Sequence, residues 1–118
     1  MDISVVLVSY NTSALTIRSL QHLFASQHPW QMEVIVVDNA SRDDSVKAVH
    51  EAYPEIPVIE NAQNVGFGRA NNQALSMAKG RYILLLNTDA FIEADTLAQT
   101  VGYMESHPEC GILGAKLL

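Results

Sequence analysis

Four short apolar segments, each followed by a longer segment with helical periodicity, constrain this chain more than any other feature. The apolar segments are residues 3–8, 33–37, 57–59 and 82–86. They run almost continuously apolar instead of alternating with polar residues, which is typical of strands covered on both faces in a parallel sheet. The sequence therefore predicts four parallel strands joined by crossover connections.

The segments between these strands predict helices. Apolar residues recur at intervals of three and four in residues 17–24, 46–53, 67–78 and 97–104. Each set forms one apolar stripe that can face a sheet. Strands that alternate with helices predict right-handed crossovers, and hence an α/β fold with an open, mainly parallel, doubly wound sheet.

The ends of these segments carry turn signals. Ser41, with Asp44 three residues later, resembles a capping box for the second helix. Gly80 predicts a left-handed end to the third helix. Residues 111–114 predict the start of a fifth strand, and the apolar pattern stops before its layer is complete. We therefore expect residues 1–118 to form a single domain whose fold is truncated.

Composition excludes several classes of protein. The chain has 118 residues and a formal net charge of −6, with its seven basic residues scattered, so a general nucleic-acid binder is disfavoured. Hydrophobic residues make up 48% of it, which argues against disorder. Its single cysteine, Cys110, excludes an internal disulfide and fits a reducing compartment. No signal peptide or long apolar stretch is present, so a soluble, cytoplasmic domain is expected.

Polar residues follow every predicted strand. Ligands bind at the carboxyl ends of the strands in open α/β sheets, so these residues are the candidates for a site. They are Ser9, Tyr10, Asn11, Asp38, Asn39, residues 60–69 and residues 87–89.

Three of these candidates have two interpretations each. Asp89 can bind a divalent cation, which prefers one or two carboxylates plus substrate phosphates, or it can cap the next helix. Asp38 can accept a hydrogen bond from a base imide or a ribose hydroxyl, or it can cap the second helix. Tyr10 can stack on a base or lie half-buried at the rim of the sheet.

Residues 66–71 begin the third helix with two glycines and Arg69. The glycines allow close approach of the backbone, and Arg69 can meet an anion. The pattern is not the dinucleotide-binding fingerprint, which requires glycines directly after the first strand. A phosphate-binding loop with its Gly-Lys-Ser/Thr signature is also absent from the sequence.

Four motifs in register resemble the family 2 glycosyltransferases of the GT-A fold, whose donor-binding half is Rossmann-like. The motifs are residues 5–11, 33–41, 64–72 and 84–89, so the resemblance covers essentially the whole chain. Asn87, at the first position of the last motif, resembles the rhamnosyltransferase-like branch of that family.

The resemblance implies transfer of a sugar from a nucleotide-diphosphate sugar to an acceptor, usually with inversion. Arg69 and Asn71 match the loop that closes on the base or the diphosphate. Asp89 matches the acid that holds a divalent metal, Mg²⁺ or Mn²⁺, against the diphosphate. The donor-binding residues implied are Ser9, Tyr10, Asn11, Asp38, Asn39, Arg69, Asn71 and Asn87.

Two departures from the family pattern limit this interpretation. Asn87 is neutral where the metal motif usually has an acid, which predicts a weaker ion site. The family's catalytic base comes from a later segment, so none is expected in this chain, which would be the N-terminal part of a longer catalytic domain. The resemblance leaves the glycan or lipid-linked acceptor unknown, and it is compatible with a location at the inner face of the membrane.

Two other functions remain in competition. A non-catalytic nucleotide-binding α/β module would share this half-fold. A receiver-type signalling domain fits less well, because it needs clustered acids after the first strand, where this chain has Ser9, Tyr10 and Asn11. An exposed final strand would leave an unpaired sheet edge, which predicts self-association into a homo-oligomer.

Overall fold

The computed structural model describes residues 1–89 and 92–109 of the chain. All four predicted strands and all four predicted helices are present. They are β1 (Ile3–Ser9), α1 (Ser13–Ala25), β2 (Met32–Asp38), α2 (Ser45–Ala52), β3 (Val58–Glu60), α3 (Phe67–Leu75), β4 (Tyr82–Asn87) and α4 (Thr96–Ser106).

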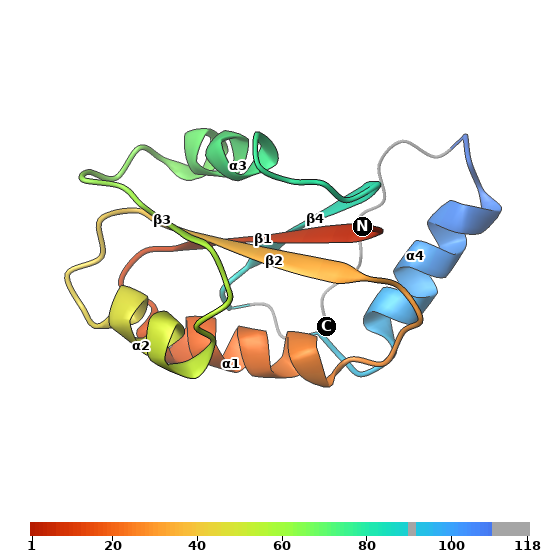
Figure 1. Ribbon diagram of the computed structural model, residues 1–118, viewed down its shortest axis with the longest axis horizontal. Coiled ribbons are helices and arrows are strands. Elements are labelled where there is room, and N and C mark those ends of the chain that lie inside the picture. The colour runs from red at the N-terminus through yellow and green to blue at the C-terminus, as the bar shows by residue number, and fades with distance from the viewer. Residues whose placement is uncertain (90–91, 110–118) are drawn as a thin grey trace.

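The strands form one sheet in the order β3-β2-β1-β4, and every pairing is parallel. β1 lies inside the sheet, where Val5 pairs with Val34 of β2 and with Leu84 of β4. Figure 1 shows α3 on one face of the sheet and α1 and α2 on the other. The predicted open, doubly wound α/β fold is therefore confirmed.

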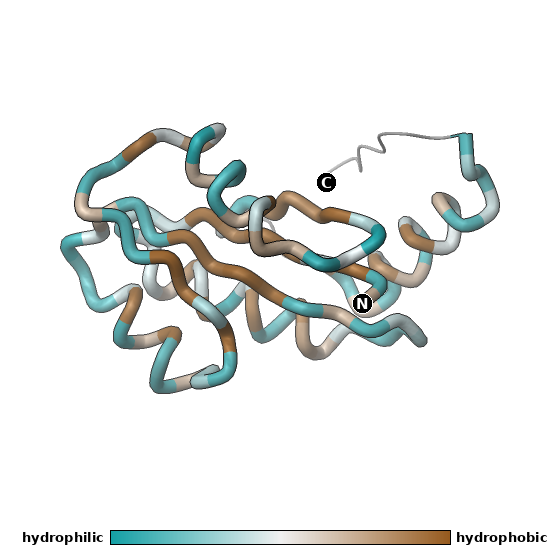
Figure 2. Tube along the Cα trace, turned by 45° about the horizontal axis from the view of Figure 1, so that its top comes forward, coloured by the Kyte–Doolittle hydropathy of each residue, from teal (hydrophilic) through white to brown (hydrophobic). Residues whose placement is uncertain are grey.

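Each face of the sheet has its own apolar core, and the strands are the most hydrophobic part of the trace (Figure 2). The core on the α1 and α2 side also receives Leu97 and Val101 of α4. On the other face, Ala70 and Ala74 of α3 lie fully buried. Because an alanine side chain ends at Cβ, α3 can lie close to the sheet. Its partners there are Val6, Ile35 and Val37.

Among residues 1–89 and 92–109, α3 contacts β1 and β2, and one face of β4 presents exposed apolar side chains. Leu85 pairs with Val6 of β1, so the two side chains share a face of the sheet. Val6 is fully buried, whereas Leu85 is 49% exposed, and Ile83 two residues earlier is 42% exposed. Within the described residues, the outer edge of β4 has no strand partner.

The capping box predicted for α2 is wrong. The helix begins at Ser45, and Asp44 makes no capping hydrogen bond with its side chain. Asp43 takes that place, because its Oδ1 accepts from the Ser45 backbone N at 3.0 Å. Ser41 donates instead to Asp38, through its hydroxyl at 2.6 Å.

The role predicted for Gly80 is also wrong, because α3 ends at Leu75 and Gly80 has no positive φ. Glycine is needed at position 80 because the backbone of β1 lies too close to leave room for a side chain. A Cβ at this position would lie 2.4 Å from the backbone N of Ser4. The same junction holds Glu33, whose Oε2 accepts from the Ser4 hydroxyl at 2.5 Å and from the Lys79 backbone N at 2.6 Å.

Two predictions fall outside the described residues: the fifth strand at 111–114 and the interpretation of Cys110. None of the helices in the described part of the chain has the length and apolarity needed to cross a membrane.

Candidate functional site

The loops after β1 and β2 are fastened to each other. The backbone N of Asn11 donates to Ser41 Oγ at 2.9 Å, and Asn11 Oδ1 accepts from the Arg42 backbone N at 2.7 Å. A third bond joins the Ser13 backbone N to Asp43 Oδ2 at 3.1 Å. Asn11 has a φ of 52°, a conformation that asparagine tolerates better than most residues. The predicted donor residue Asn11 thus already connects two loops.

Asp43 is held as an anion by this arrangement. The hydroxyl of Ser45 donates to its carboxylate and lowers the pKa of Asp43 below its ordinary value near 3.8, and the backbone N of Ser13 adds to the effect. Sequence patterns gave Asp43 no role, because its two partners lie on different helices.

Asp38, at the end of β2, is only 4% exposed, and Ser41 engages both of its carboxylate oxygens. The Ser41 backbone N donates to Oδ2 at 2.9 Å and the Ser41 hydroxyl to Oδ1 at 2.6 Å. Asp38 therefore shapes the turn after β2 and does not cap α2. Each oxygen keeps a further lone pair that a ligand can use.

Ser9 and Tyr10 lie next to each other but in different environments. Ser9 is 1% exposed, and its hydroxyl lies 3.1 Å from the hydroxyl of Thr16 and 3.3 Å from that of Thr12. Tyr10 is 48% exposed. Of this pair, only Tyr10 presents a side-chain surface on which a base can stack.

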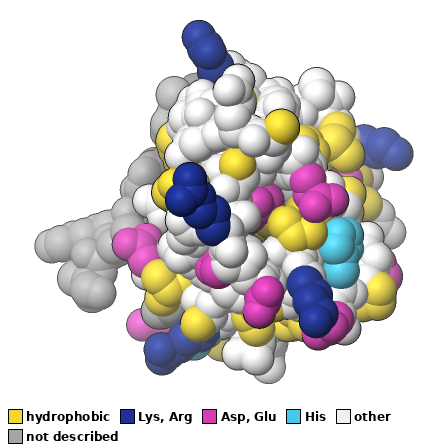
Figure 3. Space-filling model, turned by 90° about the vertical axis from the view of Figure 1, so that its left-hand side faces the viewer, with side chains coloured by type: hydrophobic (Ala, Val, Ile, Leu, Met, Phe, Trp, Pro, Cys, Tyr) yellow, Lys and Arg dark blue, Asp and Glu magenta, His cyan; other side chains and the backbone are white. Residues whose placement is uncertain are grey.

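The cleft between the end of β2 and α2 is strongly acidic. Lys47 and His50 line it together with five carboxylates, which are those of Asp38, Asp43, Asp44, Glu51 and Glu60. Figure 3 shows this end of the molecule, where acidic side chains lie among a few basic ones. The carboxylates repel a phosphate but can accept hydrogen bonds from neutral donors, so the cleft suits a nucleoside better than a diphosphate.

A network of side-chain amides, missed by the sequence analysis, surrounds Asn39. This residue is 2% exposed, its Nδ2 donates to Gly66 O at 3.2 Å, and its Oδ1 accepts from Asn61 Nδ2 at 3.0 Å. Asn61 in turn pairs with Gln73 of α3. The partners are 12 to 27 residues apart in the chain, so no local pattern could have revealed them.

Arg69 and Asn71 lie in the first turns of α3. Arg69 is exposed, and no acidic side chain within the described ranges forms an ion pair with it. Asn71 is 5% exposed, and its Nδ2 donates to Phe67 O at 3.1 Å. Its Oδ1 is buried without a hydrogen-bond partner. Arg69 is thus available to an anion, whereas Asn71 offers only an acceptor.

The end of β4 carries the predicted metal ligand. Asn87 and Asp89 are both exposed. Thr88 between them is anchored, because its carbonyl accepts from the Ser19 hydroxyl at 2.6 Å. Among residues 1–89 and 92–109, no three His, Cys, Asp or Glu side chains cluster in a metal-binding arrangement. A cation here would therefore have Asp89 as its carboxylate ligand and take its other oxygens from substrate and water, a set that suits Mg²⁺ or Mn²⁺.

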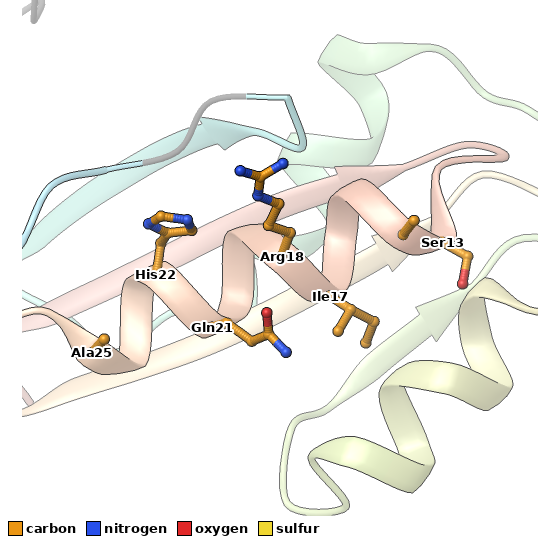
Figure 4. Close-up of a pocket in the computed structure, with 7 residues that line it drawn as sticks. Ser13, Ile17, Arg18, Gln21, His22 and Ala25 are labelled. Atoms are coloured by element: carbon orange, nitrogen blue, oxygen red, sulfur yellow. The ribbon is translucent and has the colours of Figure 1, made fainter.

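A furrow on the outer side of α1 is the other hollow of note (Figure 4). Among the residues that the structure describes, those that line the furrow all come from this helix. It is lined by Ser13, Ala14, Ile17, Arg18, Gln21, His22 and Ala25.

Comparison with known families agrees with this geometry. The sequence model of glycosyl transferase family 2 matches residues 4–116. The chain belongs to this family. It is 31% identical over 119 residues to a poly(ribitol-phosphate) β-glucosyltransferase of Bacillus spizizenii. This match covers 97% of the chain and 19% of the relative. It is 30% identical over 97 residues to a chondroitin synthase of Escherichia coli, which covers 80% of the chain and 14% of the relative.

Solved structures of the family share the fold. Residues 1–349 of Staphylococcus aureus TarS, in complex with UDP-GlcNAc, superpose with a TM-score of 0.83 at 29% identity, over 92% of this chain and 32% of TarS. A mannosyltransferase from Pyrobaculum calidifontis, in complex with GDP-Man and Mn²⁺, gives a TM-score of 0.79 at 30% identity, over 86% of this chain and 32% of that enzyme. The chain spans between 13 and 19% of the length of the first curated relatives it matches.

Proposed function

We propose that this chain forms the donor-binding part of a glycosyltransferase that uses a nucleotide-diphosphate sugar and a divalent metal. One observation carries the proposal. The exposed side chains at the carboxyl edge of the sheet include an aromatic ring, a cation and a carboxylate, those of Tyr10, Arg69 and Asp89. The solved relatives bind UDP-GlcNAc, and GDP-Man with Mn²⁺, on the same fold.

The chemistry of these side chains divides the donor between two regions. Tyr10 would stack on the base, and Asp38 in the acidic cleft would accept hydrogen bonds from the base or the ribose. Arg69 would contact the diphosphate, because its charge and fork of donors suit phosphate oxygens. The free Oδ1 of Asn71 can take only a donor, so it suits a hydroxyl or an N–H group of the ligand.

Asp89 would hold the metal beside the diphosphate. When bound, such an ion would supply neutralisation of the charge on the leaving nucleotide diphosphate. Asn87 adds no charge, so the site would bind the ion weakly until the donor's own phosphates complete it. Ser19, through Thr88, would keep the end of β4 in place for this contact.

Two acids lie close to the end of β4 in the chain. Glu93 and Asp95 precede α4 closely, where acids favour a helix start, and neither is assigned as the base for an inverting reaction. The base, and the site for the glycan or lipid-linked acceptor, would lie in a further segment. The names of two relatives, a chondroitin synthase and a succinoglycan biosynthesis protein, support a role in polysaccharide biosynthesis. A location at the inner face of the membrane stays a prediction. The rhamnosyltransferase-like assignment still rests on Asn87, and self-association on the open edge of β4.

Calorimetric titration with UDP, GDP and dTDP, each with and without Mn²⁺, tests the proposal. The wild type should bind one of these more tightly with the metal. In Asp89→Ala this enhancement should disappear, with a loss of about 100-fold in the presence of Mn²⁺ if a carboxylate ligand of the ion is removed.

Glu55→Ala is the control, because Glu55 is also an exposed carboxylate and does not line the acidic cleft. It should bind like the wild type. If Asp89→Ala retains the metal enhancement, Asp89 is not the ligand. If the nucleotides bind equally well with and without metal and a labelled donor is never turned over, the non-catalytic nucleotide-binding module becomes the better description.

A further inference from the structure

The side-chain amides of Asn61 and Gln73 form a reciprocal pair. Asn61 Nδ2 donates to Gln73 Oε1 at 2.8 Å, and Gln73 Nε2 donates back to Asn61 Oδ1 at 2.9 Å. Asn61 follows β3, whereas Gln73 lies in the second turn of α3. The pair therefore closes the whole loop between β3 and α3 across its base.

The pair continues into Asn39 at the end of β2. The second hydrogen of Asn61 Nδ2 is donated to Asn39 Oδ1 at 3.0 Å, and the same oxygen lies 3.4 Å from the Val65 backbone N. Asn39 Nδ2 then donates to Gly66 O at 3.2 Å. Three amides thus connect the strand end to the last residues before the helix.

The end point of this chain of amides is the start of α3. Gly66 has a φ of 88°, and its carbonyl also accepts the first helical bond, from Ala70 N at 3.2 Å. Because Asn39 and the helix share that carbonyl, a shift of Asn39 moves the first turn of α3. Arg69 belongs to that turn, and its guanidinium is the cation assigned to the diphosphate.

We propose that Gln73 and Asn61 are positioning residues, which act through Asn39 on the Gly66 turn and so set the place of Arg69 relative to the end of β2. This inference rests on the proposed function, since it assumes that the edge binds a nucleoside diphosphate. Gln73 does not line the acidic cleft, whereas Asn61 does, so the test is made at Gln73. Their effect is to fix the distance between the nucleoside end of the site and the diphosphate end.

The first test compares nucleoside with nucleoside diphosphate. In Gln73→Ala, affinity for UDP or GDP, whichever the wild type binds, should fall about tenfold with Mn²⁺ present, the value of one to two hydrogen bonds. Affinity for uridine or guanosine should change by roughly twofold at most, because the Gln73 side chain bonds to Asn61 and to neither Tyr10 nor the Asp38 carboxylate. Gln99→Ala is the matched control, since Gln99 is also a helical glutamine with one side-chain bond, to Asp95 at 2.8 Å.

The second test uses Gln73→Glu, which keeps the shape. At pH 8 the carboxylate cannot donate to Asn61 Oδ1, so UDP or GDP should bind more weakly than to the wild type at the same pH. At pH 5 more of the carboxyl is protonated than at pH 8, and the protonated form can donate to Asn61 Oδ1 as glutamine does. The affinity ratio to the wild type should therefore move toward one. Glu60 beside Asn61 and Arg69 one turn before Gln73 are the neighbouring charges, and they are common to both proteins.

The outcomes separate the two claims. If the wild type binds no nucleoside diphosphate, the proposed function falls, and the positioning role with it. If the wild type binds but Gln73→Ala loses nucleoside and nucleoside diphosphate affinity equally, or shows only a lower melting temperature, the positioning role is overturned while the proposed function stands. Recovery of Gln73→Glu at pH 5 distinguishes a positioned amide from a merely packed side chain.

Discussion

The two ends of the same sheet are built differently. At the amino end, the turn before β4 packs directly on β1, and Gly80 lies against Ser4. The Glu33 carboxylate accepts hydrogen bonds there from the Ser4 hydroxyl and from the Lys79 backbone N. At the carboxyl end, longer polar loops leave Tyr10 and Asp89 exposed. The polar groups at the amino end are hydrogen-bonded to one another, whereas the carboxyl end presents exposed side chains that can bind a ligand.

A second difference lies within the carboxyl end itself. The loops after β1, β2 and β3 are joined by side-chain bonds through Asn11 and Asn39. At the end of β4, Asn87 pairs with Val8 of β1 and the Thr88 carbonyl accepts from the Ser19 hydroxyl, while within the described residues no side-chain bond joins Asn87 or Asp89 to the other loops. We infer that the nucleoside end of the site is formed in advance, while the metal end is completed by the donor, an arrangement that lowers the ordering cost on binding.

Gly80→Ala is the strongest way to break the amino end. The new Cβ would lie 2.4 Å from Ser4 N, 2.6 Å from Ser4 Oγ and 2.7 Å from Ile3 C, so the backbone itself must move. Overpacking of this kind costs about 3 kcal/mol of unfolding free energy. Denaturant unfolding measures the loss. Nucleotide affinity should change little at temperatures where the variant stays folded, because the site lies at the opposite end.

Gly102→Ala provides the control for that measurement. Gly102 lies in α4 with nothing within 4 Å of its added Cβ, so the same substitution should stabilise the protein by about 0.5 kcal/mol. Equal destabilisation by both variants would mean that the Ser4 contact is not what restricts Gly80.

Two roles of Asp38, forming the turn after β2 and binding the nucleoside, can be separated by mutation. Asp38→Asn can still accept from the Ser41 backbone N and donate to the Ser41 hydroxyl, so the turn should survive and the melting temperature should stay close to that of the wild type. A carboxylate that contacts the nucleoside contributes about 1.5–3 kcal/mol, so affinity for uridine or guanosine should fall tenfold or more, with or without Mn²⁺.

Ser41→Ala is the complementary variant. It removes the 2.6 Å bond to Asp38 and the 2.9 Å bond from Asn11 N, so it should lower the melting temperature more than Asp38→Asn does. The Asp38 carboxylate remains, so nucleoside affinity should fall less than in Asp38→Asn. Unchanged nucleoside affinity in Asp38→Asn would show that Asp38 stabilises the turn after β2 and does not contact the nucleoside.

The elements of the fold could be predicted because their signals are local. Continuous apolar runs and apolar stripes at helical spacing are properties of adjacent residues, and they gave all four strands and all four helices. The position of Asp89 followed for the same reason, because a carboxylate placed just after a parallel strand must lie at the carboxyl edge of the sheet. Family membership then strengthened that placement through motifs in register.

The interactions that hold the loops could not be predicted in this way. The Asn61–Gln73 pair spans 12 residues and the Asn39–Gly66 bond 27, so only the folded chain shows that these amides meet. The capping box failed because two acids, Asp43 and Asp44, compete for one helix start, and spacing does not say which is oriented to reach it. Gly80 was misread because its constraint comes from Ser4, which is 76 residues away.

The smallest expected effect returns to the amino end, with Glu33→Gln. Burial alone would raise the pKa of Glu33, but the Ser4 hydroxyl and the Lys79 backbone N, which donate to the carboxylate, outweigh it and lower the pKa below its ordinary value near 4.5. A folded-state pKa below the unfolded one means that the anion stabilises the fold above about pH 4.5 and that this stabilisation is lost as the pH falls through the folded-state pKa.

The glutamine of Glu33→Gln can still accept both hydrogen bonds but carries no charge, so the variant should be about 1 kcal/mol less stable than the wild type at pH 7. The difference should shrink toward pH 3, where the wild-type carboxylate is being protonated. Unfolding curves at both pH values, beside exposed Glu55→Gln as control, measure it. A difference that is the same at pH 3 and pH 7 would show that Glu33 acts through its shape and not through its charge.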